Sequence, residues 1–425
     1  MTSKIAWRIV PLLALCYLVS FIDKTNIGFA QLGMQSAVGI SDAAFGLGAG
    51  VFFVGYFLFE VPSNLALARF GARRWIARIM LTWGVLVVVM IFVRGPVSFT
   101  VLRFLLGVAE AGFYPGVLYY LSKWVPGRER TKLVGLLILA NPVSTVVGGP
   151  ICGALLELDG WLGLSGWQWM FIVTGVPAVV LAAVVLRFLP ESPDRARWLS
   201  ADERAWLHDA LAAEESQAQV RHRNPLRALT DPKVLFLAAF FAAFPTAAYG
   251  LRLWLPTLVK SFHVSDFANG VLNAVPFAFA AVALVIWPRV AGRGRHLHRH
   301  LVAATLLGAA GLVATALATS LALQLVLLSI TAVGMFAAQP MYWSLPSRLL
   351  LGANAAAGLA LINSVGNLGG FVGPYVVGAI KSAGGGLRGG MFFLAAVMLY
   401  AAVMAVVSAR RLRVDEPAAV LAERR

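Results

Sequence analysis

The sequence has few of the residues that build disulfide scaffolds, metal sites or soluble surfaces. Its two cysteines, Cys16 and Cys152, lie in different apolar blocks without metal-ligand spacing, so neither a disulfide framework nor a zinc site is predicted. Charged residues make up only 13% of the 425 residues. A glycine-rich phosphate-binding loop is absent, so the sequence does not support ATP hydrolysis by this chain. No soluble segment is large enough to carry an enzyme, and we expect no cofactor.

What the sequence does have is a series of long apolar blocks. Hydrophobic residues make up 60% of the chain and the mean hydropathy is +0.80, which is typical of an all-α membrane protein with many spans. Windows of about 20 apolar residues predict twelve spans. They lie at residues 8–30, 45–68, 75–93, 98–122, 132–156, 167–189, 233–259, 267–288, 299–319, 321–346, 355–380 and 389–409.

The net charge of +16 is explained by membrane orientation. With both termini in the cytoplasm, only Arg94, Lys260, Lys381 and Arg388 fall in outer joints, and Lys24, Arg103 and Arg252 fall within spans. Every other lysine and arginine lies in a cytoplasmic segment, as the positive-inside rule requires. Residues 1–8 run directly into an apolar block without a cleavage site, so we interpret this block as a first span rather than a secretory signal. Nucleic acid is therefore not an expected partner, and the lipid bilayer is.

The longest joint divides the spans six and six. We expect a six-helix bundle at residues 1–189, a cytoplasmic linker at 190–232, a second six-helix bundle at 233–410 and a cytoplasmic tail at 411–425. Ser200 and Glu203 form a capping box that predicts a short amphipathic helix to about Ala213, followed by a flexible stretch at 214–224.

The two halves carry traces of an internal repeat. Asn141 precedes the glycine-rich segment 148–153 in the fifth span, and Asn363 precedes the similar segment 369–375 in the eleventh. Repeated halves with a binding site at their interface are an architecture of secondary transporters.

The fourth span carries Arg103 and Glu110, seven residues or two helical turns apart on one face. At about 1.5 Å per residue Asp23 lies about 22 Å from the cytoplasmic end of its span, and Arg103 about 9 Å from the outer end of its own. Across a core about 30 Å thick these depths coincide, so we expect Asp23 to meet Arg103. An acid beside an arginine but away from water can titrate as access changes, which proton coupling requires. The alternative is an ion pair that only joins two helices.

Lys24 is expected to turn away from this contact toward a central cavity, unpaired by its neighbour Asp23, where it could be the counter-ion of a carboxylate substrate. Arg252, near the outer end of the seventh span, either extends to the interface or steers anions inward. Glu60 is interpreted as a partner of the basic joints. The histidines at 296, 298 and 300 favour a solvated basic turn over a metal site. Uncharged candidates to orient a ligand are Tyr17, Phe21, Tyr56, Asn141, Asn363 and, more weakly, Trp343.

The sequence resembles the anion:cation symporter family of the major facilitator superfamily, such as its sugar-acid, tartrate and phthalate transporters. The similarity covers nearly the whole chain and rests on segments 8–11, 23–30, 57–64, 71–78, 103–116, 166–169, 254–256 and 360–374. It implies twelve helices in two bundles, alternating access and proton-coupled import of an organic carboxylate across a bacterial-type inner membrane.

The resemblance also implies site residues. Asp23 and Glu110 correspond to the proton carriers, Arg103 to their partner, and Lys24, Tyr56, Asn141 and Asn363 to the substrate site. The chain departs from the family where Ala68 replaces a loop acid, where a Ser-Asp pair is missing near residue 289, and where Arg252 replaces a small residue; the last departure suggests a more highly charged substrate.

Two other functions stay open from sequence. A proton-independent anion exchanger or exporter is suggested by Gly148-Gly-Pro150, a pattern also seen in antiporters. A transporter-like membrane sensor is the second alternative, although the sequence shows no output domain beyond the short tail.

Overall fold

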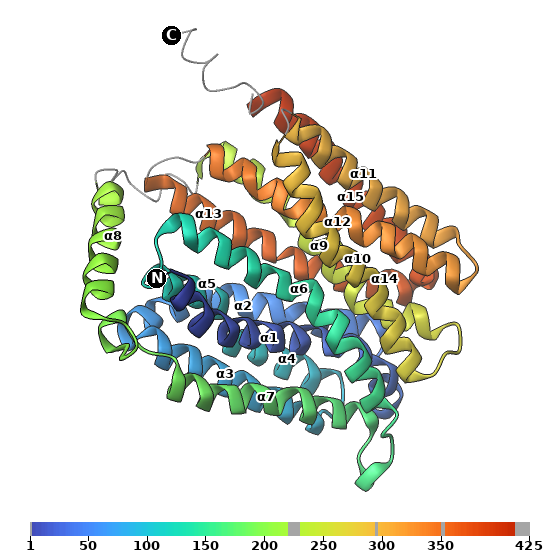
Figure 1. The fold of residues 1–425 in the computed structure, drawn as a ribbon. Coiled ribbons are helices and arrows are strands. Elements are labelled where there is room, and N and C mark those ends of the chain that lie inside the picture. Colours follow the sequence, from blue (N-terminus) through green and yellow to red (C-terminus); the bar gives the residue numbers. More distant parts are fainter. Residues whose placement is uncertain (1, 220–229, 294–295, 350–352, 413–425) are drawn as a thin grey trace. The chain divides into compact units, whose positions relative to one another are not determined.

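The computed structural model describes residues 2–219, 230–293, 296–349 and 353–412 (Figure 1). Most of the predicted tail, and residues 220–224 of the stretch expected to be flexible, lie outside this part of the chain. The helices are α1 Thr2–Val38, α2 Asp42–Phe70, α3 Ala72–Val89, α4 Pro96–Glu110, α5 Phe113–Ser122, α6 Gly127–Leu156, α7 Gly166–Phe188, α8 Ala201–Gln219, α9 Pro232–Lys260, α10 Asp266–Arg293, α11 Leu297–Leu317, α12 Leu321–Leu349, α13 Ala353–Asn367, α14 Gly369–Ile380 and α15 Gly386–Leu412.

Every predicted span coincides with a described helical segment, which confirms the all-α fold. Eleven candidate membrane spans are found by length and hydropathy. The last of them, Gly358–Arg410, has 53 residues, enough for two crossings. It is divided by a π-helical turn at Lys381–Gly385, where Gly384 and Gly386 have φ values of 89° and 60°. Left-handed backbone is open to glycine without steric cost, so the chain can reverse there, giving twelve crossings.

The chain folds as two compact units. Unit 1 comprises Met1–His222 and His263–Val271, and unit 2 comprises Arg223–Phe262 and Leu272–Arg425. The segment we expected as a linker between bundles is shared: α8 belongs to unit 1, and the residues just before α9 belong to unit 2.

Helices α2 and α4 pack closely against each other inside unit 1. Gly107 of α4 lies against the backbone of Phe52, so that a Cβ at this position would overlap the Phe52 carbonyl oxygen. Gly55 of α2 likewise lies against the backbone of Phe104: a Cβ on Gly55 would be 2.5 Å from the Phe104 carbonyl oxygen. Two glycines thus let the helices approach closely enough for α4 side chains to reach the α2 backbone.

The predicted fourth span is two helices, because the chain breaks directly after Glu110. Ala111 has an extended ψ of 133° and Gly112 has a left-handed φ of 83°. A Cβ on Gly112 would lie 2.5 Å from the Ser63 hydroxyl, so both the conformation and the packing require glycine. Glu110 is therefore the last residue of α4, where the helix dipole disfavours a negative charge.

Unit 2 has a core rich in aromatic residues around α9 and α12. Tyr342 packs edge-on against Phe240 at a centroid distance of 4.9 Å and stacks with Phe241 at 5.3 Å. Its hydroxyl donates to the Leu237 carbonyl at 2.6 Å, which satisfies the one polar atom of the ring. This core belongs to unit 2 alone.

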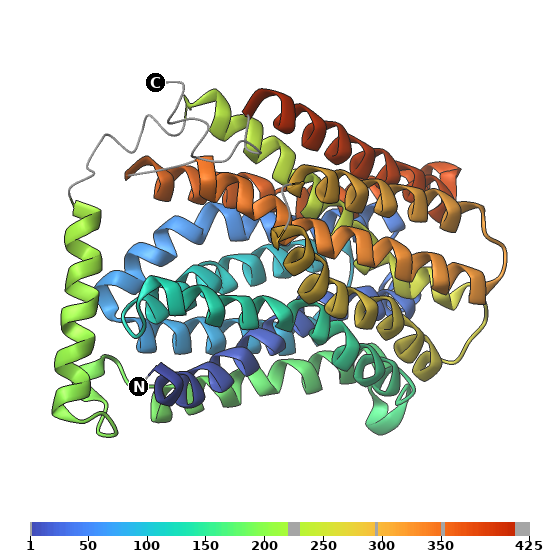
Figure 2. The ribbon, with the colours of Figure 1, turned by 45° about the horizontal axis from the view of Figure 1, so that its top comes forward.

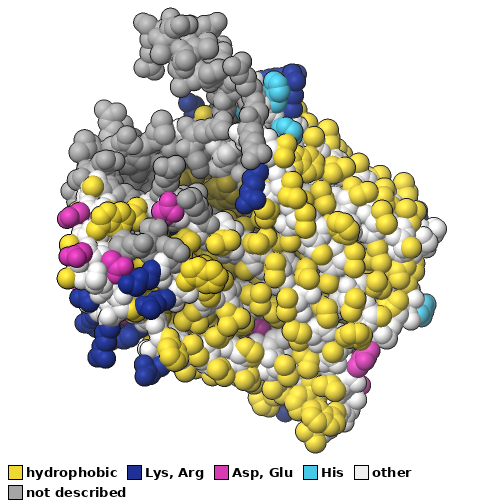
Figure 3. Space-filling view, in the orientation of Figure 1, with side chains coloured by type: hydrophobic (Ala, Val, Ile, Leu, Met, Phe, Trp, Pro, Cys, Tyr) yellow, Lys and Arg dark blue, Asp and Glu magenta, His cyan; other side chains and the backbone are white. Residues whose placement is uncertain are grey.

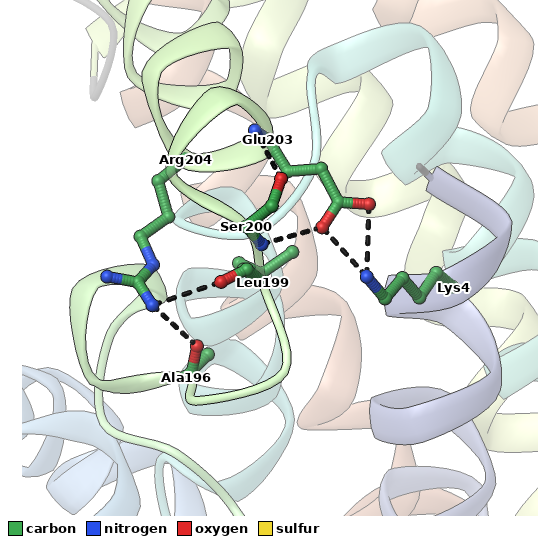
Figure 4. A network of polar contacts seen from close by, with 6 residues as sticks. All are labelled: Lys4, Ala196, Leu199, Ser200, Glu203 and Arg204. Atoms are coloured by element: carbon green, nitrogen blue, oxygen red, sulfur yellow. Dashed lines mark hydrogen bonds and ion pairs between the residues drawn. The ribbon is translucent and has the colours of Figure 1, made fainter.

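The capping box at the start of α8 is confirmed. The Ser200 hydroxyl accepts from the Glu203 amide at 3.1 Å, and Glu203 accepts from the Ser200 amide at 2.9 Å (Figure 4). The helix continues to Gln219, beyond the predicted Ala213. It runs across the ends of the other unit 1 helices, beside the start of α1, as Figures 1 and 2 both show. Lysines and arginines gather at this end, whereas the rest of the face in view is largely apolar (Figure 3).

Candidate functional site

Asp23 and Lys24 lie side by side in the middle of α1 and are both buried in unit 1, with exposed fractions of 2% and 9%. Consecutive residues of a helix point about 100° apart, so the two charges serve different neighbours. Lys24 faces α4 and α2, and Asp23 faces α3. Lys24 and Asp23 therefore belong to two different groups of polar contacts inside unit 1.

The Lys24 ammonium is bound by the Glu110 carboxylate. Their Nζ and Oε1 atoms are 2.5 Å apart, and Glu110 is 1% exposed. Ser20, one turn before Lys24, joins them: its hydroxyl donates to Glu110 Oε1 at 2.5 Å and accepts from Lys24 Nζ at 3.1 Å. The lysine offsets the unfavourable position of the glutamate at the end of α4. Removing either partner would leave the other charge buried without its counter-ion.

Aromatic rings surround the ammonium group of Lys24. The nitrogen lies 5.2 Å from the Phe21 ring centroid and 5.6 Å from that of Tyr56. Tyr17 packs edge-on against Phe21 at 4.9 Å and stacks with Tyr114 at 5.2 Å. Ring faces attract cations, so these rings stabilise the ammonium whichever anion is paired with it.

The Asp23 carboxylate is held by neutral donors. Trp83 of α3 donates its indole N–H to Oδ2 at 2.9 Å, and the Asn26 side-chain nitrogen lies 3.5 Å from Oδ1. The same nitrogen is 2.9 Å from the hydroxyl of Thr174 on α7, which fixes the amide. In the described part of the chain no cationic group lies within ion-pair distance of Asp23.

The expected contact between Asp23 and Arg103 is wrong. Arg103 is 2% exposed, donates to the Ala49 carbonyl at 3.3 Å and lies over the Phe52 ring at 4.9 Å. Lys24 is not paired with its neighbour Asp23, as expected, and it is bound by Glu110 instead. The error about Arg103 has one cause: depth along a helix can be estimated from sequence, but the rotation of α1 that turns Lys24 toward α4 cannot.

Arg252 of α9 does not extend to the interface. Its side chain is 5% exposed, and its guanidinium carbon lies 4.9 Å from the Phe277 centroid and 5.7 Å from that of Phe336. This excludes the surface alternative considered from sequence. The histidine segment also differs from expectation: His296 is exposed, but His298 is buried and His300 is half-buried on α11.

Three other predicted residues are half-buried in separate helices. Asn141 lies on α6 of unit 1, and Asn363 lies on α13 of unit 2. Trp343 of α12 packs against Phe241 at 4.7 Å. Their roles at a ligand stay predictions.

Sequence reasoning missed Ser20, Asn26, Trp83 and Thr174. The first two had a usable signal, since Ser20 lies four residues before Lys24 and Asn26 three residues after Asp23, the spacings at which helix side chains meet. Trp83 and Thr174 had none, because only the packing of α3 and α7 brings them to α1.

Glu191 occupies the joint where the sequence lacks the expected loop acid. Its carboxylate accepts from the Arg73 amide at 3.4 Å and lies 3.5 Å from the Arg73 side-chain Nε. Gly71, with φ of 90°, leaves room for it: a Cβ there would lie 2.5 Å from Glu191 Oε1. An acid from the segment after α7 thus contacts the joint between α2 and α3.

Comparison with known proteins places the chain in a family. Residues 13–374 match the model of the Major Facilitator Superfamily. A putative tartrate transporter of Agrobacterium vitis is 48% identical over 407 residues, covering 96% of this chain and 91% of the relative. A quinolone resistance transporter of Acinetobacter baumannii is 46% identical, with 95% and 93% covered. The inner membrane transport protein RhmT of Escherichia coli strain K12 is 36% identical, with 92% and 91% covered.

Solved structures show the same fold at low sequence identity. A bacterial homologue of the human lysosomal transporter Spinster, in an inward-facing conformation, has a TM-score of 0.79 at 19% identity, covering 96% of this chain and 98% of its own. A D-xylose–proton symporter has a TM-score of 0.72 at 16% identity, with 94% and 97% covered. The chain therefore belongs to the Major Facilitator Superfamily, in the anion:cation symporter branch that its motifs indicate, and it is a secondary transporter in the membrane rather than an enzyme.

Proposed function

We propose that this protein imports an organic carboxylate together with protons across a bacterial inner membrane, with both of its termini in the cytoplasm. The observation that carries the proposal is the buried Lys24–Glu110 pair, in which a carboxylate is the counter-ion of a cation.

Protonation of Glu110 would release Lys24 for the substrate. A neutral glutamate no longer balances the ammonium, and an unbalanced buried charge costs several kcal/mol, on the order of 3–5. A substrate carboxylate that takes the place of Glu110 restores the balance. Proton and substrate binding are then mutually favourable, because each increases the affinity for the other by the same factor.

Asp23 would supply a second proton site. Import of more protons than substrate charges moves net positive charge inward, which gains about 2.3 kcal/mol per charge at 100 mV. Arg103, seven residues before Glu110 on α4, would then stabilise whichever acid is ionised during the cycle. These roles make Asp23, Glu110 and Arg103 the proposed coupling residues.

The proposed substrate contacts begin at Lys24. Phe21 and Tyr56 would contact the substrate beside the bound carboxylate, because their rings already lie against the ammonium. Asn141, Asn363 and Trp343 would contribute further contacts. The Agrobacterium relatives, named as putative tartrate transporters and 48% and 47% identical, support a hydroxylated carboxylate as substrate.

Glu110→Gln tests the proposal in proteoliposomes. A neutral glutamine leaves Lys24 permanently available, so we expect substrate counterflow to persist while accumulation driven by a pH gradient is lost. Glu60→Gln is the matched control, since it neutralises another buried carboxylate of unit 1, 5% exposed, that is not bound to Lys24. Full pH-driven accumulation by Glu110→Gln would exclude the residue from coupling.

Export is a second candidate, favoured by the 46% identity to a quinolone resistance transporter. The same residues would serve a proton antiporter if protonation released the substrate instead of admitting it. Uptake into everted vesicles on acidification of their lumen would favour export, whereas uptake into right-side-out vesicles driven by external acid would favour import.

A further inference from the structure

The Asp23 carboxylate has hydrogen-bond partners other than the Lys24–Glu110 pair. Trp83 is fully buried, and its indole N–H points at Oδ2 from 2.9 Å. Asn26 and Thr174 are 1% and 5% exposed, and their mutual hydrogen bond is 2.9 Å long. Asp23 itself is 2% exposed, so bulk water does not replace these partners in this conformation.

We propose that Trp83 is a positioning residue that sets the proton affinity of Asp23, and that the hydroxyl of Thr174 adds to this effect. This inference rests on the proposed proton coupling and assigns its regulation to two residues without charge. An N–H donor stabilises the ionised carboxylate and has no acceptor role toward a protonated one.

The ionisable groups around Asp23 are few. On α1 itself Lys24 is adjacent, from α4 Glu110 acts on Asp23 at longer range, and on α6 the thiol of Cys152 is nearby. The contacts that α3 and α7 make here are the uncharged indole and hydroxyl. Direct hydrogen bonds therefore have a large share in deciding when Asp23 takes up a proton.

The geometry around Asn26 predicts a second effect of the same sign. Its side-chain nitrogen is 2.9 Å from Thr174 but 3.5 Å from Asp23, so the amide is held closer to the hydroxyl than to the carboxylate. The Thr174 hydroxyl also acts on Asp23 directly and favours its ionised form. Without this hydroxyl, the ionised form of Asp23 becomes less stable.

Infrared difference spectroscopy of the purified full-length protein tests both effects. The carboxylic C=O band of Asp23, assigned by its disappearance in Asp23→Asn, is followed as a function of pH. In Trp83→Phe we expect the midpoint of this titration to move up by about one pH unit, as loss of a hydrogen bond to a charged group implies. In Thr174→Val we expect a smaller shift to higher pH.

Trp167→Phe is the matched control. Trp167 is also a buried tryptophan of unit 1, 4% exposed, and its indole nitrogen has no hydrogen-bond partner in the described structure. The same substitution there should leave the Asp23 band unchanged. An unshifted midpoint in Trp83→Phe, or an equal shift in Trp167→Phe, would overturn the proposal. If Trp83→Phe fails to fold, as judged by gel filtration, a shift to lower pH or no shift in Thr174→Val overturns it.

The readout separates this inference from the proposed function. If the Asp23 band shifts as expected but the pH dependence of uptake is the same in wild type and Trp83→Phe, the positioning role stands and Asp23 is not the coupling group. If the band does not shift while uptake remains coupled to protons through Glu110, the proposed function stands and the role of Trp83 is wrong.

Discussion

The two units use charge in opposite ways. Unit 1 buries Asp23, Lys24, Glu60, Arg103 and Glu110, so both signs are present in its interior. In unit 2 the described helices bury Arg252 against phenyl rings, and the other buried polar side chains include Asn273, His298 and Gln324 but no carboxylate. Between residues 232 and 412 the sequence contains a single acid, Asp266, and it lies in the segment that belongs to unit 1. Unit 1 can therefore exchange protons between buried acids and bases, whereas unit 2 buries no acid among its described residues.

The largest expected effect comes from breaking the ion pair of unit 1. Lys24→Met leaves Glu110 buried without its counter-ion, so we expect the free energy of unfolding to fall by about 3 kcal/mol and uptake to be abolished. The double variant Lys24→Met/Glu110→Gln should recover most of the stability but none of the uptake. Thermal unfolding in detergent and uptake assays measure the two effects.

The corresponding lysine change in unit 2 is the control for this prediction. Lys381 lies over the Trp254 ring at 5.1 Å and is half-buried, so Lys381→Met should cost less than about 1 kcal/mol. Equal losses of stability in Lys24→Met and Lys381→Met would show that the buried ion pair of unit 1 does not make Lys24 more important for stability than Lys381.

A smaller effect is expected at Arg252, a buried arginine of unit 2, and it tests whether this residue acts on substrate. The attraction of a cation for an anion scales with the charge of the anion. In Arg252→Met we therefore expect KM to rise about tenfold for a dicarboxylate and only about twofold for a monocarboxylate of similar size. Arg388→Met, at an exposed position in the first turn of α15, is the control. If affinity falls equally for both substrate classes, Arg252 serves packing. Charged side chains that act on substrate would then be confined to unit 1.

The smallest expected effect concerns the contact of α8 with α1, outside the membrane-spanning segments. The Lys4 ammonium binds Glu203 at 2.8 and 3.1 Å, and this hydrogen bond, with the Ser200 amide, lowers the pKa of Glu203 below the ordinary value of 4.5 (Figure 4). A lowered pKa means that the ionised form is favoured by the docked state. The contact is therefore present at neutral pH and is lost as the pH falls below 4.5 through the lowered value.

A spin label at Ala205→Cys should detect this loss as increased mobility between pH 5 and pH 3. Background substitution His208→Asn removes the exposed His208–Asp194 contact, 2.7 Å long, so that it does not contribute to the change. In Lys4→Met the label should already be mobile at pH 7. An unchanged label in that variant would show that the burial of Leu207, which is fully covered, holds α8 in place by itself.

Much of the fold could be predicted from the sequence because it depends on the hydropathy and spacing of residues that are close together in the chain. The span positions follow from hydropathy, the start of α8 from the Ser200–Glu203 spacing, and the candidate charges from the cost of placing Lys24 or Glu110 in lipid. The break after Glu110 was not foreseen, although Gly112 and Pro115 lie in the segment, because glycine is common in membrane helices and only its contact with Ser63 requires it here.

The sequence by itself determined which residues are charged, how deep they lie and that the chain crosses the membrane many times. Only the tertiary structure decided which charges meet. Hydrophobicity and helix rise fix the length and depth of each helix independently of its neighbours, but its rotation is fixed by side-chain packing against the others. The rotation of α1 brings Lys24 into contact with Glu110 and Asp23 into contact with Trp83, and the proposed chemistry follows from these two contacts.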